Sequence, residues 1–261
     1  MIDKFVDIGT HQLHVVLAEN ASKYTIVLEA GGGKTADSYQ AIQDQLASLT
    51  GMQVMSYDRS GFGQSELGPA HFSAVDEVKA LKRCLEIQGF AEKLILVGLS
   101  YGGYLIQIFA ILYPEPVSGL VLIDPMNVRF VDHIGLEKLN AMMPYFENPA
   151  TNSEKAGNRM IDFSSESFAA LRGKELPHYI PAILLTSGFL PLPGMWRQCH
   201  EEMVMNSDKH RLIIAEGNHH DIVEENPELV IKTIIELIGS SSCFDCSQTP
   251  VVRLKQSLGA K

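Results

Sequence analysis

The pattern of apolar and polar positions divides most of the chain into alternating strands and helices. Short apolar runs predict buried strands, and the stretches between them carry apolar residues three and four positions apart, which predicts amphipathic helices. The expected strands are 5–8, 12–17, 25–30, 52–57, 94–97, 118–123, 182–186 and 211–215. The expected helices are 37–49, 74–87, 104–113, a segment near 196–205, and 227–237. The first two strands flank a Gly9-Thr10-His11 turn, which predicts an antiparallel hairpin.

The regular alternation predicts an α/β fold with a mostly parallel central sheet and helices on both faces, because successive parallel strands need helical crossovers. The alternation stops between 126 and 181, where the helical pattern returns only in patches, at 136–146 and 163–171. We interpret this segment as a helical cap inserted over the strand ends, where such sheets bind ligands. The predicted domains are a core domain made of 1–125 and 182–240, the cap insertion at 126–181, and a loose tail at 241–261.

Composition narrows the range of partners. The chain has 261 residues, 46% of them apolar, which is enough for one large domain with a substantial core. Its formal net charge is -10 and no basic cluster interrupts it, which argues against nucleic acid or an anionic membrane as a partner. The N-terminus lacks the pattern of a signal peptide and no apolar run reaches membrane-spanning length, so a cytoplasmic location is expected.

The four cysteines, Cys84, Cys199, Cys243 and Cys246, do not indicate a disulfide framework. The last two form a single C-x-x-C pair without a second pair or a nearby histidine, which is a weak signal for a metal or redox site. We therefore expect this pair to be two free thiols.

The strongest chemical signal is the point where the strand at 94–97 runs into Gly98-Leu99-Ser100-Tyr101-Gly102, a Gly-x-Ser-x-Gly sequence that a helix follows. Strand, sharp turn and helix in this order are the context in which such a serine acts as a nucleophile. The turn strains the serine backbone and requires small residues on both sides, and the helix N-terminus favours developing negative charge. Ser100 is therefore the candidate nucleophile, with a serine in an ordinary glycine-rich turn as the competing interpretation.

A serine hydroxyl needs a base that removes its proton, and the base must itself be oriented. His219 and His220 lie in the loop after the last expected strand, at the sheet edge that also presents Ser100. The other histidines lie in strands, helices, ordinary loops or the insertion, without comparable context. The late pair therefore supplies the candidate base.

The orienting carboxylate should stand at the end of a strand. Asp124 comes directly after the strand at 118–123, whereas the strand at 182–186 ends in a sequence that contains no acid. By elimination Asp124 is the candidate, in the chain order Ser, Asp, His. A turn or helix-capping role before Pro125 is the alternative for this residue.

Acyl transfer also needs two backbone N–H groups directed at the oxyanion. One is expected from Tyr101, the residue after the nucleophile. The other is expected from the loop Gly31-Gly32-Gly33, because glycine lets the main chain approach a substrate closely.

Four motifs together resemble the α/β-hydrolase fold family, and within it the branch of capped esterases, lipases and aminopeptidases. They are Gly31-Gly32-Gly33 after a strand, the loop Tyr57-Asp58-Arg59-Ser60-Gly61-Phe62-Gly63-Gln64-Ser65, the turn at Ser100 and the late histidine pair. The similarity covers about residues 5–238.

The resemblance implies particular residues. In the family the catalytic histidine commonly stands seven residues before a proline that opens the last helix. His220 has this spacing to Pro227, so His220 is preferred to His219. By the same comparison the amides of Gly32 and Tyr101 would form the oxyanion hole.

The chain also departs from the family pattern. It has Ala30-Gly31 where the family usually has His-Gly, which removes a loop-stabilising imidazole but leaves the amides. The acid usually follows the strand after the insertion, whereas Asp124 precedes the insertion, as it does in some family members.

The resulting prediction is a serine hydrolase, without a metal or organic cofactor, that cleaves a small to medium, fairly hydrophobic ester, lactone or amide through an acyl-enzyme on Ser100. An acyltransferase would use the same residues with an acceptor other than water, and the sequence leaves this open. The expected partner is a small-molecule acyl substrate in a mainly apolar pocket. The candidate pocket residues are Met126, Met142, Met143, Phe146, Phe189, Met195 and Trp196.

Two further classes of function would use the sequence differently. Gly33-Lys34-Thr35 resembles the end of a P-loop and the strand before Asp124 resembles a Walker-B strand, but Leu28 stands where the first glycine of a P-loop belongs. That interpretation also leaves the serine and the histidine without a role. A catalytically silent binding protein on the same scaffold should lack one of the three catalytic residues, and none is missing.

Overall fold

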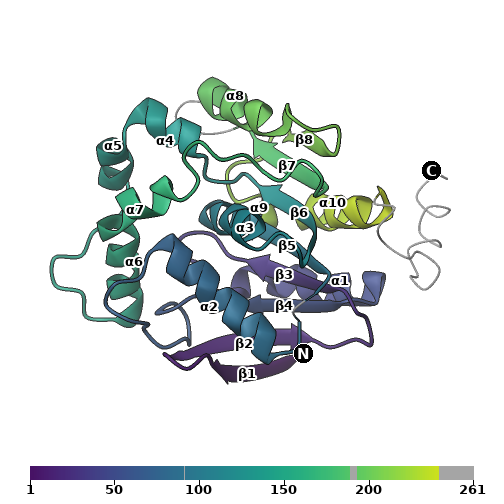
Figure 1. Cartoon of the computed structure of the whole chain (residues 1–261), viewed down its shortest axis with the longest axis horizontal. Coiled ribbons are helices and arrows are strands. Elements are labelled where there is room, and N and C mark those ends of the chain that lie inside the picture. Colours follow the sequence, from purple (N-terminus) through teal and green to yellow (C-terminus); the bar gives the residue numbers. More distant parts are fainter. Residues whose placement is uncertain (91, 189–192, 241–261) are drawn as a thin grey trace.

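The computed structural model describes residues 1–90, 92–188 and 193–240. Its strands are β1 Ile2–Asp7, β2 Gln12–Ala18, β3 Thr25–Glu29, β4 Gln53–Tyr57, β5 Leu94–Leu99, β6 Val117–Ile123, β7 Ala182–Ser187 and β8 His210–Ala215. They form one sheet in the order β1-β2-β4-β3-β5-β6-β7-β8 (Figure 1). β1 and β2 pair antiparallel, as do β2 and β4, and the other neighbouring strands pair parallel. The predicted hairpin and mostly parallel sheet are thus confirmed.

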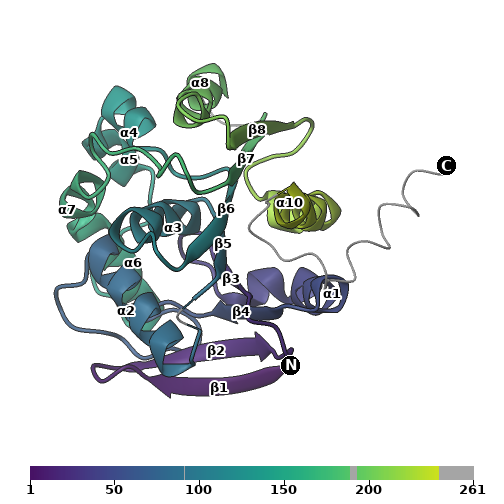
Figure 2. The same ribbon diagram turned by 45° about the vertical axis from the view of Figure 1, so that its right-hand side comes forward.

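Helices cover both faces of the sheet, as the alternation predicted. They are α1 Gln40–Thr50, α2 Ala74–Ile87, α3 Tyr101–Leu112, α4 Val128–Ile134, α5 Leu136–Ala141, α6 Asn152–Asp162, α7 Ser164–Ala169, α8 Pro193–Val204, α9 Ile222–Glu225 and α10 Pro227–Ser240, with a 3-10 turn η1 at Ala36–Tyr39. α2, α3 and α8 pack on one face, and α1 and α10 pack on the other (Figure 2).

The central strands are buried throughout, which explains why plain apolar runs identified them. Every residue of β3, β5 and β7 is buried. A parallel strand with helices on both sides has no solvent-facing side, so its sequence does not alternate between apolar and polar. β5 lies between β3 and β6 in the sheet, and its C-terminal end leads into the serine turn.

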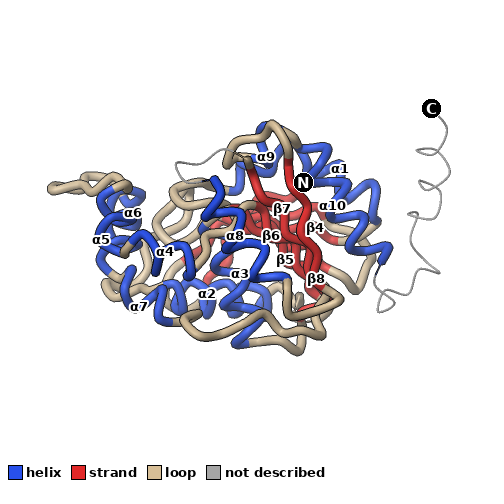
Figure 3. The backbone as a smooth tube through the Cα atoms, turned by 90° about the horizontal axis from the view of Figure 1, so that it is seen from above, coloured by secondary structure: helices blue, strands red, loops and turns tan. Residues whose placement is uncertain are grey.

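The chain between β6 and β7 forms the four helices α4 to α7, which gather at one end of the molecule (Figure 3). We call α4 to α7 the cap helices. α5 ends at Ala141, well before the expected end at 146, because Pro144 cannot continue a helix. The sequence pattern missed α4 and α6. α6 nevertheless begins at a capping box, in which the Thr151 and Glu154 side chains bond to each other's backbone N–H.

Some expected boundaries shift for local reasons. α3 begins directly at Tyr101, because the N–H of Tyr104 already donates to the Ser100 carbonyl at 3.0 Å.

No described helix combines the length and the apolar character needed to cross a bilayer. The predicted tail at 241–261, with its two cysteines, and Phe189 lie outside the described residues.

Candidate active site

Ser100 occupies a sharp turn between β5 and α3. Its backbone has φ 53° and ψ −115°, a left-handed conformation that is costly for a residue with a side chain. A Cβ on Gly98 would lie 2.6 Å from the Gly102 carbonyl carbon, and a Cβ on Gly102 would lie 2.3 Å from the Glu29 carbonyl oxygen. Both glycines are therefore required by close backbone packing, and the turn directs the Ser100 hydroxyl away from the sheet edge.

The structure brings Ser100, His220 and Asp124 together from three separate loops at that edge. His220 Nε2 lies 2.7 Å from Ser100 Oγ, and His220 Nδ1 lies 2.6 Å from Asp124 Oδ2. A carboxylate only accepts hydrogen bonds, so Nδ1 carries the proton and Nε2 is free to accept the serine proton. This is the arrangement in which an imidazole can activate a hydroxyl.

Asp124 is fully buried and accepts more than the histidine proton. Its carboxylate also accepts the Ser187 N–H at 2.8 Å, the Ser187 hydroxyl at 2.7 Å and the Trp196 indole N–H at 2.8 Å. Burial by itself raises the pKa of Asp124, but the hydrogen bonds from His220, Ser187 and Trp196 outweigh burial and hold that pKa below its usual value. The carboxylate thus stays ionised beside the imidazole.

The position of Trp196 corrects the expectation that it lines the pocket. Its ring is buried against Phe130 and His200, and its N–H is used by Asp124. A buried indole N–H needs an acceptor, and the carboxylate behind the site provides one. Met195 packs partly buried in the same cluster.

The position of Phe146 is a second correction. It lies in the loop after α5, where its backbone N–H and carbonyl both bond to the Asn158 side chain. Its side chain is exposed, and Phe146 is not among the described residues that line the cavity at the serine.

A cavity of about 400 Å³ opens beside Ser100, between the sheet edge and the cap helices. Met126, Met142 and Met143 line it, as expected for three of the candidate pocket residues. The described residues that line it are Gly31, Gly32, Lys34, Leu99, Ser100, Tyr101, Met126, Leu139, Met142, Met143, Met160, Ser167, Phe168, His220 and Asp221. Most of these side chains are apolar, so the cavity can hold an apolar group next to the serine.

Gly32 and Tyr101, the two residues expected to supply the oxyanion amides, both line this cavity beside Ser100. They are also direct neighbours, because a Cβ on Gly32 would lie 3.6 Å from the Cβ of Tyr101. The two residues expected to form the oxyanion hole therefore lie side by side next to the serine.

Lys34 and Asp221 form an ion pair across the cavity mouth. Lys34 follows the glycine loop, and Asp221 follows His220 and caps the N-terminus of α9. Glu224 lies 3.8 Å from the same ammonium group. The pair joins the glycine loop to the histidine loop.

Sequence reasoning missed Ser187 and Trp196 as partners of Asp124. Ser187 carries a usable signal, because it ends β7, the sheet neighbour of β6. Trp196 lies on α8 and carries none, since only the folded packing brings it to the carboxylate.

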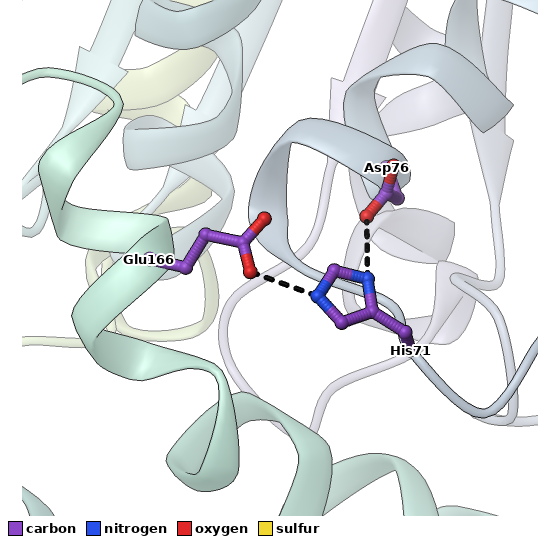
Figure 4. Close-up of side chains that lie close together, drawn as sticks. All are labelled: His71, Asp76 and Glu166. Carbon is purple, nitrogen blue, oxygen red and sulfur yellow. Dashed lines mark hydrogen bonds and ion pairs between the residues drawn. The ribbon is translucent and has the colours of Figure 1, made fainter.

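Possible metal ligands come together in the described residues at His71, Asp76 and Glu166. His71 Nε2 lies 2.8 Å from Glu166 Oε2, and its Nδ1 lies 3.6 Å from Asp76 Oδ2. The two carboxylates face opposite sides of the imidazole instead of a shared centre (Figure 4). Asp76 also accepts bonds from the Ser73 N–H and hydroxyl. We interpret the group as a link between α2 and the cap helix α7.

Comparison with known proteins agrees with this geometry. A family model described as alpha/beta hydrolase fold matches residues 24–225. The uncharacterized protein YqjL from Bacillus subtilis (strain 168) is 23% identical over 258 residues, or 95% of this chain and 94% of that protein. A proline iminopeptidase from Lactobacillus helveticus (strain DPC 4571) is 27% identical over 158 residues, or 58% of this chain and 52% of the peptidase. The chain thus aligns with about half the length of that peptidase.

Solved structures share the architecture. The carboxylesterase CesB (YbfK) from Bacillus subtilis superposes with a TM-score of 0.64 at 15% identity, covering 92% of each chain. A hydrolase from Pseudomonas aeruginosa PA01 gives a TM-score of 0.67 at 17% identity, covering 91% of this chain and 98% of that chain. At these identities the likeness is one of fold.

Proposed function

The chain belongs to the α/β-hydrolase fold family and is a hydrolase, and we propose that it cleaves a small to medium, fairly hydrophobic carboxylic ester through an acyl-enzyme on Ser100. The observation that carries this proposal is the hydrogen-bonded chain from Ser100 Oγ to His220 Nε2 at 2.7 Å and from His220 Nδ1 to Asp124 Oδ2 at 2.6 Å. A hydroxyl, a base and an orienting carboxylate in this relation are what covalent acyl transfer requires.

The reaction begins when Ser100 Oγ attacks the acyl carbon and His220 Nε2 takes the hydroxyl proton. The amides of Gly32 and Tyr101 stabilise the oxyanion, and the buried Asp124 carboxylate stabilises the imidazolium. The imidazolium then protonates the leaving oxygen, and the C–O bond breaks to leave an acyl-enzyme. Water, deprotonated by His220, attacks that acyl carbon and releases the acid and the free serine.

The cavity wall supports an apolar acyl group. Its methionines, with Leu139 and Phe168, can adapt to acyl groups of different shape. The volume of about 400 Å³ is at the small end of ligand pockets and suits a small to medium substrate.

The same wall favours an ester over the substrate of a proline iminopeptidase. An amide with a free N-terminal ammonium group would need an unpaired carboxylate in the cavity. Among the described wall residues Asp221 is the carboxylate, and Lys34 already pairs with it. The aminoacyl amide therefore stays the second candidate, supported by the similarity to the peptidase.

Ser100→Ala tests the proposal. Hydrolysis of p-nitrophenyl esters from acetate to octanoate should fall by about 10⁴- to 10⁶-fold, the loss typical of removing a catalytic nucleophile. Ser153→Ala, at an exposed serine of α6, is the matched control and should retain activity. A fluorophosphonate should label the wild type and Ser153→Ala but not Ser100→Ala.

Two further assays separate the alternatives. Faster turnover of prolyl amides than of any ester would favour the peptidase activity over the esterase activity. Ester products formed from an added alcohol at the expense of the free acid would favour acyl transfer over hydrolysis. Full activity of Ser100→Ala would overturn all three proposals.

A further inference from the structure

Arg59 lies in the core directly behind the glycine loop, and its side chain is almost completely buried. One amino group, Nη1, donates to the Ala30 carbonyl at 2.5 Å and to the Glu29 carboxylate at 2.9 Å. The other, Nη2, donates to the Gly31 carbonyl at 2.7 Å. A single guanidinium therefore fixes two successive peptide groups of the loop that carries Gly32.

The bond to Gly31 has a direct consequence for the oxyanion site. The Gly31 carbonyl and the Gly32 N–H belong to the same planar trans peptide, in which the two groups point in opposite directions. Arg59 at 2.7 Å and the Lys34 N–H at 3.1 Å both donate to the carbonyl end of that peptide, so its N–H end points the other way, and Gly32 lines the cavity. A cation on the carbonyl also polarises the peptide, which makes its N–H a stronger donor.

Arg59 also contacts the second half of the oxyanion site. Its guanidinium carbon lies 5.4 Å from the centre of the Tyr101 ring, within the range of a cation–π contact. Its Nε lies 3.0 Å from Glu77, which in turn accepts the Tyr101 hydroxyl at 3.2 Å. Both residues that supply the proposed oxyanion amides are thus tied to one side chain.

Resting on the proposed function, we infer that Arg59 is the positioning residue of the oxyanion hole, because it aims the Gly32 amide and holds Tyr101 beside it. Arginine is suited to the task, since its planar fork donates to two carbonyls and to the Glu29 carboxylate while its Nε stays within ion-pair distance of Glu77. A lysine at the same place has a single nitrogen. It can keep the charge balance with Glu29 and Glu77, but its three N–H groups radiate from one atom and cannot reproduce the planar spacing of the bonds from Nη1 and Nη2.

A contribution to stability alone does not account for the buried cluster of Arg59, Glu29 and Glu77. A buried ion pair is weak evidence of stabilisation, because desolvating the charges costs about as much as pairing them returns. Burial by itself lowers the pKa of Arg59, but the Glu29 and Glu77 carboxylates raise it by a larger amount. The net pKa lies above the usual value, so the guanidinium stays charged. A permanent cation behind the glycine loop is an electrostatic element of the proposed oxyanion site.

Arg59→Lys tests the inference, because it retains the positive charge while removing the planar geometry of the guanidinium. The kcat for a p-nitrophenyl ester should fall by about 10- to 100-fold, less than the 10²- to 10³-fold cost of deleting a donor outright. The KM should stay within about twofold, since the ground-state ester does not use the hole. Affinity for a trifluoromethyl ketone, whose serine adduct carries the oxyanion, should fall by the same factor as kcat/KM.

Gln43→Leu is the matched control. Gln43 is fully buried, donates to the Val16 and Val54 carbonyls, both at 2.8 Å, and accepts the Ser56 hydroxyl at 2.7 Å, and the cavity wall contains none of these four residues. Its loss should lower stability and leave kcat unchanged. A merely structural role for Arg59 would give the same result as this control.

The outcomes separate the two claims. Activity that survives Ser100→Ala overturns the proposed function together with the positioning role. Loss of activity in Ser100→Ala, with an unchanged kcat in Arg59→Lys, overturns the positioning role alone. If Arg59→Lys does not fold, Glu77→Gln, which loosens the link from Arg59 to Tyr101, should still lower kcat by a few-fold, and an unchanged kcat there would overturn the inference.

Discussion

Ser100 and Asp124, at the ends of adjacent strands, both have a positive φ angle, which is uncommon for a residue with a side chain. Their φ angles are 53° and 42°, in the left-handed region that residues with a side chain rarely adopt. The only other described residue of this kind, glycines excluded, is Lys93, at the opposite end of β5. Strain of this type persists only where the surroundings enforce it, so its concentration at one sheet edge supports the functional assignment of that edge.

Trp196→Phe should slow catalysis without changing the pocket. Phenylalanine keeps the packing against Phe130 but removes the N–H that Asp124 accepts, so the pKa of Asp124 should rise and its hold on His220 should weaken. One lost hydrogen bond of about 0.5–1.5 kcal/mol predicts a fall in kcat of about 3- to 10-fold. Steady-state kinetics on acetate and hexanoate esters measures it.

Phe130→Leu serves as the control for Trp196→Phe, because it alters the packing of the indole ring without touching the carboxylate. An increase in KM for the longer ester alone, at constant kcat, would instead mean that Trp196 forms part of the pocket wall.

Among single residues, the sequence was sufficient to predict the candidate catalytic residues, because their roles follow from the order of motifs and strands along the chain. Ser100, Asp124 and His220 each follow a strand, and parallel strands end at one edge, so their proximity could be anticipated. Trp196 and Arg59 could not be read in this way. Their partners are a buried carboxylate and two carbonyls that only the folded packing brings within reach.

The turn between β5 and α3 depends on the absence of side chains at two glycines. Gly102→Ala should prevent accumulation of folded protein, because its Cβ would lie 2.3 Å from the Glu29 carbonyl and 2.4 Å from the Ala30 carbonyl. These atoms are all backbone at the end of β3 and cannot yield, so the expected loss of stability is more than about 4 kcal/mol. Urea unfolding, or the yield of soluble protein, measures it.

Gly157→Ala provides the contrast for this element. Gly157 lies in α6, and nothing lies within 4 Å of the Cβ that alanine would add. Alanine is the better helix former by about 1 kcal/mol, so this change should stabilise the protein slightly. Equal stability of the two variants would show that the turn between β5 and α3 tolerates a side chain at Gly102.

The helices and strands differ in how clearly the sequence predicts them. The strands of the central sheet are buried on both faces, so their apolar runs stand out. α6 is mostly polar, with only Ala156 and Asn158 buried, so it lacks the apolar stripe that marks a helix. Its capping box at Thr151 and Glu154 is the signal that could have located it. α4 has only seven residues, too few to show a clear helical period, and Asn127 caps it.

At the scale of the whole molecule, the site is a joint product of the sheet and the cap helices. The sheet edge supplies Ser100 and His220, and α5, α6 and α7 contribute apolar wall residues such as Leu139, Met160 and Phe168. The ion contacts of His71 tie α7 to α2 on the outer side of this junction (Figure 4). The sequence indicated an insertion at this place, but the alignment of its helices over the serine is set by packing.

The pH dependence of the free energy of unfolding should report the titration of the buried Glu77 carboxyl group. Burial raises its pKa to about 7, against the opposing effect of Arg59, from a reference value of 4.5. Between these two pH values the folded protein retains the proton while the unfolded chain releases it. Unfolding therefore becomes easier as the pH rises through this window, since stability falls with pH wherever the folded state binds more protons.

Glu77→Gln removes that titration, so the free energy of unfolding of the wild type, relative to this variant, should decrease between about pH 4.5 and about pH 7. The expected change is on the order of a few kcal/mol. Urea unfolding of both proteins across this range measures the difference, in which titrating groups that do not interact with Glu77 cancel because both proteins contain them. Glu228→Gln makes the same chemical change on the exposed surface of α10 and serves as the matched control. A difference between wild type and Glu77→Gln that stays constant with pH would mean that Arg59 keeps Glu77 ionised throughout, and that the pair behaves as a fixed charge.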